Sequence, residues 1–112
     1  MIYDLEGRTK SFSGNVLDFL QTVPRNDFTR NIISQLIRSA TSIGANYHEA
    51  NGGCSRKEFK NRISICLRET KETKYWIELL AKCKAVELAV LRKIWKEADE
   101  FSLIFGQIYS SL

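Results

Sequence analysis

Apolar residues recur in steps of three and four along most of the chain, and this spacing constrains the fold more than any other feature of the sequence. Positions three and four residues apart lie on one face of an α-helix, whereas a half-buried strand alternates with a period of two. The pattern is interrupted at Pro24, at Gly52-Gly53 and, more weakly, at Lys84-Ala85. The spacing therefore predicts four helices, at about residues 4–22, 27–50, 56–83 and 86–111.

Each predicted helix carries one narrow stripe of apolar or small residues, which we expect to form the core. The four stripes contain Leu5, Thr9, Phe12, Val16, Phe19 and Val23; Leu36, Ala40, Ile43, Tyr47 and Ala50; Phe59, Ile63, Cys66, Thr70, Thr73, Ile77 and Leu80; and Leu91, Ile94, Ala98, Phe101, Phe105, Ile108 and Leu112. Helices of this kind that are joined by short turns pack side by side. We therefore predict an all-α, antiparallel up-down four-helix bundle in which residues 1–112 form a single domain.

Length and composition are those of one globular domain. The chain has 112 residues, 44% of them hydrophobic and 27% charged, and a chain of this size can bury roughly two thirds of the surface that its unfolded form exposes. No apolar run approaches the roughly 20 residues of a membrane-spanning helix, and the first residues lack the apolar segment of a signal peptide. We expect a cytoplasmic protein, in which Cys54, Cys66 and Cys83 are small buried thiols rather than disulfides.

The turn between the second and third predicted helices has local signals of its own. Ser55 and Glu58 have the spacing of a capping box, in which the serine hydroxyl accepts a hydrogen bond from the amide three residues later. Asn51, Gly52 and Gly53 tolerate the left-handed backbone angles at which many helices end. No lysine followed by serine or threonine stands after these glycines at the spacing of a phosphate-binding loop, so we read the segment as a corner.

Gly44 lies inside the second predicted helix, where it costs up to about 1 kcal/mol relative to alanine. It is surrounded by small residues, namely Ser34, Ser39, Thr41, Ser42 and Ala45. Small residues let a second helix approach closely. One interpretation is tight packing inside the bundle, and the other is a groove that receives another chain.

One side of the third predicted helix is basic. At about 100° per residue, the following residues share an arc, interrupted by Ser64 and Glu78: Lys57, Lys60, Arg68, Lys71, Lys74 and Lys82, with Arg56 nearby. A lysine stripe can be a solvated face, or it can bind nucleic-acid phosphates with little sequence specificity. The net charge of +4 is compatible with both. The candidate nucleic-acid-binding residues are Arg56, Lys57, Lys60, Arg68, Lys71 and Lys74.

A second side of the same helix is apolar and charged at once. It carries Ile65, Trp76, Leu79 and Cys83 together with Glu58, Arg62, Glu69 and Glu72. A helix in an isolated bundle needs only one buried stripe, so a further patch with a tryptophan indicates contact with another subunit. The alternative is that Trp76 is covered by its own fourth helix, through Trp95. The candidate oligomer-interface residues are Ile65, Glu69, Glu72, Trp76 and Leu79.

Motifs of catalysis or metal binding are absent from the sequence. His48 is the only histidine, and Glu49 follows it, but no HExxH or CxxC pattern accompanies them. We expect His48 on the flank of the second helix near its C-terminal end, where an imidazolium suits the helix dipole. We therefore predict a non-enzymatic protein with no catalytic residue, no metal and no cofactor.

The segments QLIRSATSIGANYHEANGGCSRKEF and ICLRETKETKYWIELL resemble the signature of the "four helix bundle protein" family, also called 23S rRNA intervening-sequence or S23 ribosomal proteins. The resemblance runs from DLEGRTKSF nearly to the C-terminus. It implies a homopentameric barrel and kinship with the accessory variability determinant of diversity-generating retroelements, whose basic surface is proposed to engage RNA and a reverse transcriptase. It implies no catalytic residue, and the matched positions Asn46, Tyr47, Glu49, Glu69 and Glu72 are interpreted as structural or interfacial.

Together these features predict an oligomeric bundle whose partners are its own copies and RNA or DNA. The alternative is a protein-interaction scaffold or an accessory subunit, for example of a reverse transcriptase, that does not contact nucleic acid itself. No membrane partner is expected.

Overall fold

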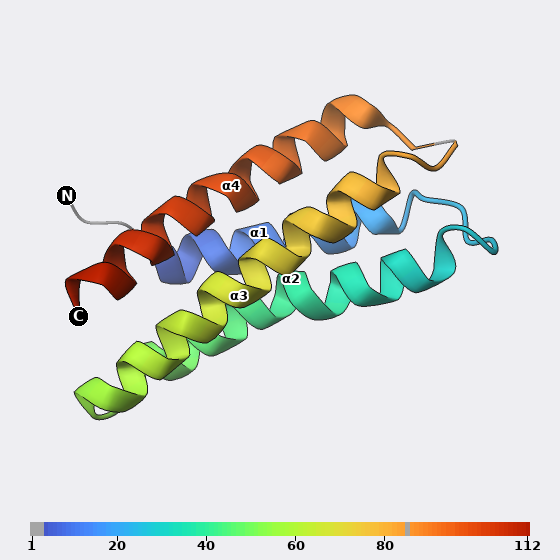
Figure 1. Ribbon diagram of the computed structural model, residues 1–112. Helices are drawn as coiled ribbons and strands as arrows, with labels where there is room; N and C mark the ends of the chain where they lie inside the picture. Colours follow the sequence, from blue (N-terminus) through green and yellow to red (C-terminus); the bar gives the residue numbers. More distant parts are fainter. Residues whose placement is uncertain (1–3, 85) are drawn as a thin grey trace.

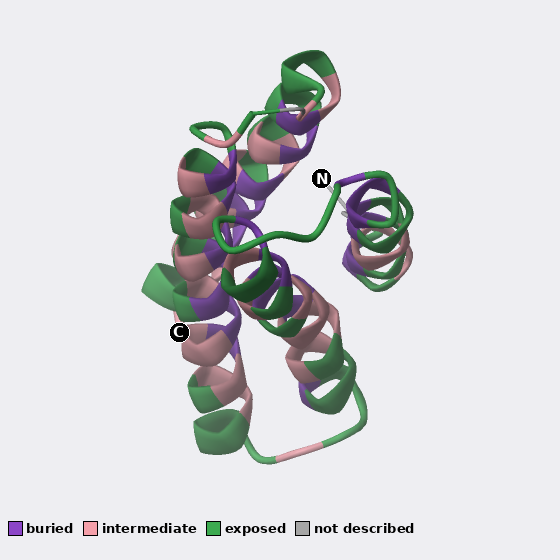
Figure 2. Ribbon diagram, turned by 90° about the vertical axis from the view of Figure 1, so that its right-hand side faces the viewer, coloured by how far each residue is buried: buried purple, intermediate pink, exposed green. Residues whose placement is uncertain are grey.

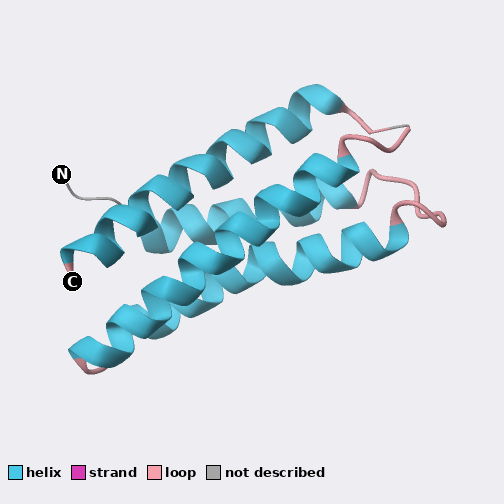
Figure 3. Ribbon diagram, in the orientation of Figure 1, coloured by secondary structure: helices cyan, strands magenta, loops and turns pink. Residues whose placement is uncertain are grey.

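The four helices run alternately up and down and lie side by side (Figure 1). The computed structural model describes residues 4–84 and 86–112, so Ala85 at the third predicted break lies outside the described residues. The helices are α1 (Leu5–Leu20), α2 (Arg30–Asn51), α3 (Arg56–Leu80) and α4 (Leu88–Ser111). Figure 3 shows helices and loops throughout the described residues, without strands. The predicted all-α up-down bundle is confirmed.

Neighbouring helices in the chain are also neighbours in space. α2 packs against α1 and α3, α3 packs against α4, and α1 and α4 close the bundle with the smallest contact. The α1–α2 and α3–α4 loops lie at one end, and the α2–α3 turn lies with the C-terminus at the other (Figure 1). The bundle extends over 44 × 24 × 20 Å.

The buried residues of the four helices face one another (Figure 2). Most predicted stripe positions are buried, including Thr9, whose hydroxyl donates to the Leu5 carbonyl at 2.7 Å. The exceptions are half-buried, namely Tyr47, Phe59, Ile108 and Leu112. Leu20, Ile33 and Ile104 are buried as well although the stripes did not include them.

The contact between α1 and α4 is aromatic at its centre and ionic at its edge. The rings of Phe12 and Phe101 meet edge to face with centroids 5.4 Å apart. Arg8 lies 5.1 Å from the Phe101 ring and donates to Glu97 at 2.7 Å, with Glu100 3.2 Å away. Burial lowers the pKa of Arg8, but its bonds to the two carboxylates outweigh burial and leave that pKa raised. Arg8 is therefore a permanent cation that ties α1 to α4.

Several helices are shorter than predicted. α2 begins at Arg30 rather than 27, because the Asn26 side chain accepts from the amides of Phe28 and Thr29, and the Thr29 hydroxyl donates to the Pro24 carbonyl at 2.6 Å. These bonds satisfy the backbone in a non-helical turn. α1 ends at Leu20 and α4 begins at Leu88.

The end of α3 is also earlier than predicted. It ends at Leu80 rather than 83, where the amides of Lys82 and Cys83 bond to carbonyls three residues back. Bonds of this length tighten a helix end into a 3₁₀-type turn.

The corner between α2 and α3 agrees with its local signals. The Ser55 hydroxyl accepts from the Glu58 amide at 3.1 Å, as the capping box predicts. Gly53 has φ of +87°, the left-handed conformation that glycine adopts without strain. Gly44 lies against α1, because a Cβ there would stand 3.3 Å from the Thr9 hydroxyl oxygen. Close packing between α1 and α2 is therefore one use of the small residues.

All three cysteines are free thiols. Cys66 is fully buried, while Cys54 and Cys83 are half-buried. Within the described residues, no helix has the length and apolar character needed to cross a membrane.

Candidate nucleic-acid and subunit interfaces

The basic residues of α3 divide into two groups. Four of the six candidates are exposed, and among the described residues none of the four takes part in an ion pair: Arg56, Lys57, Arg68 and Lys71. Lys57, Arg68 and Lys71 lie on the side of the helix opposite its buried residues, and Arg56 is the first residue of the helix. We call the surface formed by these four residues the outer face of α3.

The other two candidates turn toward α4. The Lys74 amine lies 2.7 Å from Asp99 and 4.8 Å from the centroid of the Trp95 ring. Its side chain is 21% exposed. The Lys60 amine lies 4.9 Å from the centroid of the Tyr109 ring. Lys74 is thus matched by a carboxylate and a π face, and its charge contributes less to the outer face than the sequence suggested.

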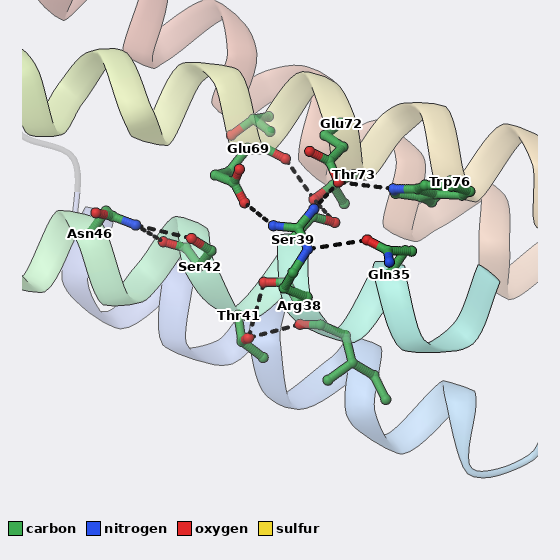
Figure 4. A network of polar contacts seen from close by, with 12 residues as sticks. Gln35, Arg38, Ser39, Thr41, Ser42, Asn46, Glu69, Glu72, Thr73 and Trp76 are labelled. Atoms are coloured by element: carbon green, nitrogen blue, oxygen red, sulfur yellow. Dashed lines mark hydrogen bonds and ion pairs between the residues drawn. The ribbon is translucent and has the colours of Figure 1, made fainter. Parts of the chain in front are cut away.

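The opposite flank of α3 holds an ionic cluster with α2 (Figure 4). The Arg38 guanidinium of α2 donates to Glu69 at 2.9 Å and also to Glu72. Glu72 accepts a further bond, at 3.0 Å, from the indole N–H of Trp76. Glu69 is 7% exposed. Two candidate interface residues, Glu69 and Glu72, therefore have partners inside their own chain.

Sequence reasoning missed Arg38, the centre of this cluster. Its Nε donates to Gln35 at 3.2 Å, which sets the plane of the guanidinium from its own helix. Beside it, the Thr73 hydroxyl donates to Ser39 at 2.9 Å. Every buried polar side-chain atom in the described residues has a hydrogen-bond partner. A lone arginine among the small residues of α2, with no acid within a turn of it, was the signal for a partner on another helix.

A second polar contact joins α2 and α3 nearer their connecting turn. Arg62 donates to the side-chain carbonyl of Asn46 at 2.9 Å, and the Asn46 amide donates back to the Ser42 carbonyl at 2.9 Å. The resemblance implied a structural or interfacial role for Asn46, and this contact is a structural one.

Trp76 is half-buried and packs against the edge of the core. Its ring meets that of Tyr75 edge to face at 5.1 Å. The alternative that Trp95 covers it does not fit, because Trp95 lies over Lys74 and donates to Glu78 at 3.0 Å on the flank that faces α4. Ile65 and Leu79 are half-buried, and the role of this side in an oligomer stays a prediction.

Tyr75 was not among the predicted site residues. It is 54% exposed and follows Lys71 by four positions, which places it within the basic arc. The four-residue spacing from Lys71 was the feature of the sequence that placed Tyr75 beside the basic residues. The outer face is therefore basic and aromatic.

His48 lies at the surface near the end of α2, as expected. Its Nδ1 is 3.0 Å from Glu6 of α1, and both side chains are largely exposed. They border a shallow pocket that also includes Lys10 and Gly44. Within the described residues, no three metal-ligating side chains gather in one place.

The thiol inside the bundle is not a reactive group. Burial raises the pKa of Cys66 to about 12, and its Sγ lies 3.5 Å from the Ile43 carbonyl, to which it donates. A thiol with this pKa is protonated at neutral pH and is a poor nucleophile. Burial, with the charge of Glu6 as a smaller cause, also raises the pKa of Tyr47.

Comparison with known proteins identifies a family and similar solved structures. The model of the family described as 23S rRNA-intervening sequence protein matches residues 6–107. A crystal structure of a protein of unknown function from the S23 ribosomal protein family of Bacteroides thetaiotaomicron is similar, with a TM-score of 0.80 and 28% sequence identity. The similarity covers 94% of this chain and 97% of that one. No curated protein matches.

Proposed function

The chain belongs to the 23S rRNA-intervening sequence protein family, and from this premise we propose that it is a non-enzymatic, cytoplasmic homo-oligomer that binds RNA or DNA through the outer face of α3. The observation that carries the proposal is the group of four exposed bases, Arg56, Lys57, Arg68 and Lys71, without ion-pair partners among the described residues. Cations of this kind are the ones that replace counterions along a phosphate backbone.

The division of charge within the bundle supports this assignment. Arg8, Arg38 and Lys74 each lie within 4 Å of a carboxylate on another helix, so they serve the fold. The basic side chains of the outer face are available to pair with an external anion. Lysine and arginine at a helix surface contact phosphates and do not recognise individual nucleobases, so we expect binding with little sequence preference.

Oligomerisation is the second part of the proposal, and the family resemblance described above implies a homopentamer. The surface that we assign to the subunit contact contains Ile65, Trp76 and Leu79 together with Glu69 and Glu72. Partly exposed apolar and aromatic groups beside paired charges are typical of an interface, in which an apolar core is surrounded by a polar rim. In an assembly the basic strips repeat, and their fields add.

The test is binding of the purified protein to structured RNA and to duplex DNA over a series of salt concentrations. We expect the logarithm of affinity to fall linearly with the logarithm of salt concentration. The double variant Arg68→Glu, Lys71→Glu should reduce that slope by about 1.5 or more. Light scattering on the same samples gives the oligomeric mass.

The matched control reverses two exposed bases elsewhere, Lys10 on α1 and Arg25 in the α1–α2 loop. The variant Lys10→Glu, Arg25→Glu has the same net charge as the double variant on α3. An equal loss in both variants would indicate that net charge alone attracts the nucleic acid. Absence of binding at low salt by a well-formed oligomer would contradict the proposal.

A protein-interaction scaffold is the second candidate, and an exposed apolar patch favours it. Phe28 is 78% exposed and lines a surface pocket with Ile32, Leu79 and Cys83, bordered by Lys82. Exposed apolar groups that cluster in this way are typical of protein contacts. An accessory subunit of this kind predicts a stoichiometric protein partner that is lost in Phe28→Ser, while RNA affinity stays unchanged.

A further inference from the structure

Tyr75 is the one feature of the outer face that phosphate binding leaves unused. Its ring is 54% exposed in the middle of α3, although tyrosine at the surface of a helix forgoes the burial that usually holds an aromatic group. It stands four residues after Lys71 and seven after Arg68, so all three lie on the same side of the helix. An exposed aromatic ring thus follows two exposed cationic side chains, one and two helical turns away.

The Tyr75 ring packs against a neighbouring ring that is itself held by a hydrogen bond. It meets the Trp76 ring edge to face at 5.1 Å, and the Trp76 indole donates to Glu72 at 3.0 Å. Glu72 in turn accepts from Arg38 of α2. These contacts connect the exposed ring to the ionic cluster between α2 and α3. A ring held in this way loses little conformational freedom when a ligand binds to it.

Other aromatic rings on this side of the bundle have a face covered by a cation. Lys60 lies 4.9 Å from the Tyr109 centroid, and Lys74 lies 4.8 Å from the Trp95 centroid. Within the described residues, no such cation lies over Tyr75. Tyr75 is therefore an exposed ring that no cation of the described residues covers, one and two turns beyond two exposed cationic side chains.

We propose that the outer face of α3 selects unpaired nucleic acid over duplex, with one base stacked on Tyr75 while the neighbouring phosphates contact Arg68 and Lys71. The proposal rests on the nucleic-acid binding proposed above and names its substrate class. Lysine and arginine alone would hold the phosphates of single and double strands alike. A surface ring discriminates between the two, because the bases of a duplex are stacked on one another and present no free face.

The test measures binding of the protein, residues 1–112, to one RNA in two states. The probe is a single-stranded RNA of roughly 15 nucleotides, close to the longest site of one small domain, used alone or annealed to its complement. One adenine is replaced by 2-aminopurine, whose fluorescence falls when the base stacks. We expect tighter binding of the single strand and fluorescence quenching on binding.

Three variants separate stacking from charge. Stacking of one base contributes roughly a factor of ten to affinity. Tyr75→Leu should therefore weaken single-strand binding about tenfold and abolish the quenching of 2-aminopurine on binding. Its affinity for the duplex should change by less than about twofold. Tyr75→Trp should keep both signals. Arg68→Glu combined with Lys71→Glu should weaken binding to both states of the RNA.

The outcomes distinguish base stacking on Tyr75 from nucleic-acid binding by the outer face in general. Equal affinity of the wild-type protein for both RNA states, or no effect of Tyr75→Leu, overturns the stacking role and leaves nucleic-acid binding standing if the charge variant still loses affinity. Absence of binding to both states overturns both. Circular dichroism and light scattering check the variants, and a fall in oligomeric mass in Tyr75→Leu would place the ring in a subunit contact and overturn the inference.

Discussion

The charged residues on the two polar sides of α3 differ in whether they have partners within the chain. Toward α2, the carboxylates of Glu69 and Glu72 share the Arg38 guanidinium. On the outer face, Arg68 and Lys71 have no carboxylate within ion-pair distance in the described part of the chain. The sequence pattern indicates a candidate subunit contact on the first side and a candidate nucleic-acid-binding surface on the second.

The difference separates charges that hold the fold from charges that are available to a ligand. Removal of one partner from a mostly buried ion pair leaves a charge without compensation, which costs stability. Removal of an exposed, unpaired base changes stability by less than about 0.5 kcal/mol but takes away a contact with any bound anion. Substitutions on the two sides should therefore affect different measurements.

The largest expected effect on stability is that of Arg38→Leu. It leaves Glu69 without its cation at a site where that residue is 7% exposed. A fully buried pair would cost about 3–5 kcal/mol. Arg38 itself is 48% exposed, so we expect a loss of about 2 kcal/mol. Urea unfolding followed by circular dichroism measures it.

The matched control for that prediction is Arg68→Leu on the outer face, which should change the unfolding free energy by less than about 0.5 kcal/mol. The double variant Arg38→Leu, Glu69→Leu should recover part of the loss, because it removes the uncompensated charge. Equal effects of Arg38→Leu and Arg68→Leu would remove the distinction between the two sides.

Periodicity predicted the bundle because burial leaves a repeating pattern along each helix. Thr9 and Cys66 were placed in the core on spacing alone, although one is polar and the other could have been read as reactive. The same reasoning placed Arg68 and Lys71 on an arc separate from the core stripe, and both residues are exposed. Each of these positions depends only on the direction of a residue from its own helix axis.

Partners across helices could not be predicted in this way. Arg38 and Glu69 are 31 residues apart, and Lys74 and Asp99 are 25 apart. Whether such side chains meet depends on the rotation and offset of two packed helices, which the spacing within one helix leaves open. The spacing therefore grouped Lys74 with Lys71 in the basic arc, although the Lys74 side chain packs against α4.

Lys71 and Lys74, three residues apart in α3, allow a lysine without an ion pair in the described residues to be compared with a paired one within a single turn. Lys74→Met removes the contacts with Asp99 and Trp95, and we expect it to destabilise the protein by about 1 kcal/mol because the pair is partly buried. Its RNA affinity should fall by less than twofold.

Lys71→Met is the matched substitution on the outer face. It should leave the thermal midpoint within the error of the wild-type value while it lowers RNA affinity and the salt slope. Thermal unfolding and RNA titration of both variants measure the two effects. Reversed results would mean that Lys74, rather than Lys71, faces the ligand.

The smallest expected effect is at the exposed pair of His48 and Glu6. Their side chains are 3.0 Å apart at the closest approach, a distance similar to that between Arg38 and Glu69. Both remain in contact with water, which screens their attraction, and an exposed pair contributes about 0–1 kcal/mol. We expect His48→Ala to change the unfolding free energy by less than about 0.5 kcal/mol, measured by urea unfolding at neutral pH. A loss as large as that of Arg38→Leu would show that distance, rather than burial, determines the strength of the contacts between these helices.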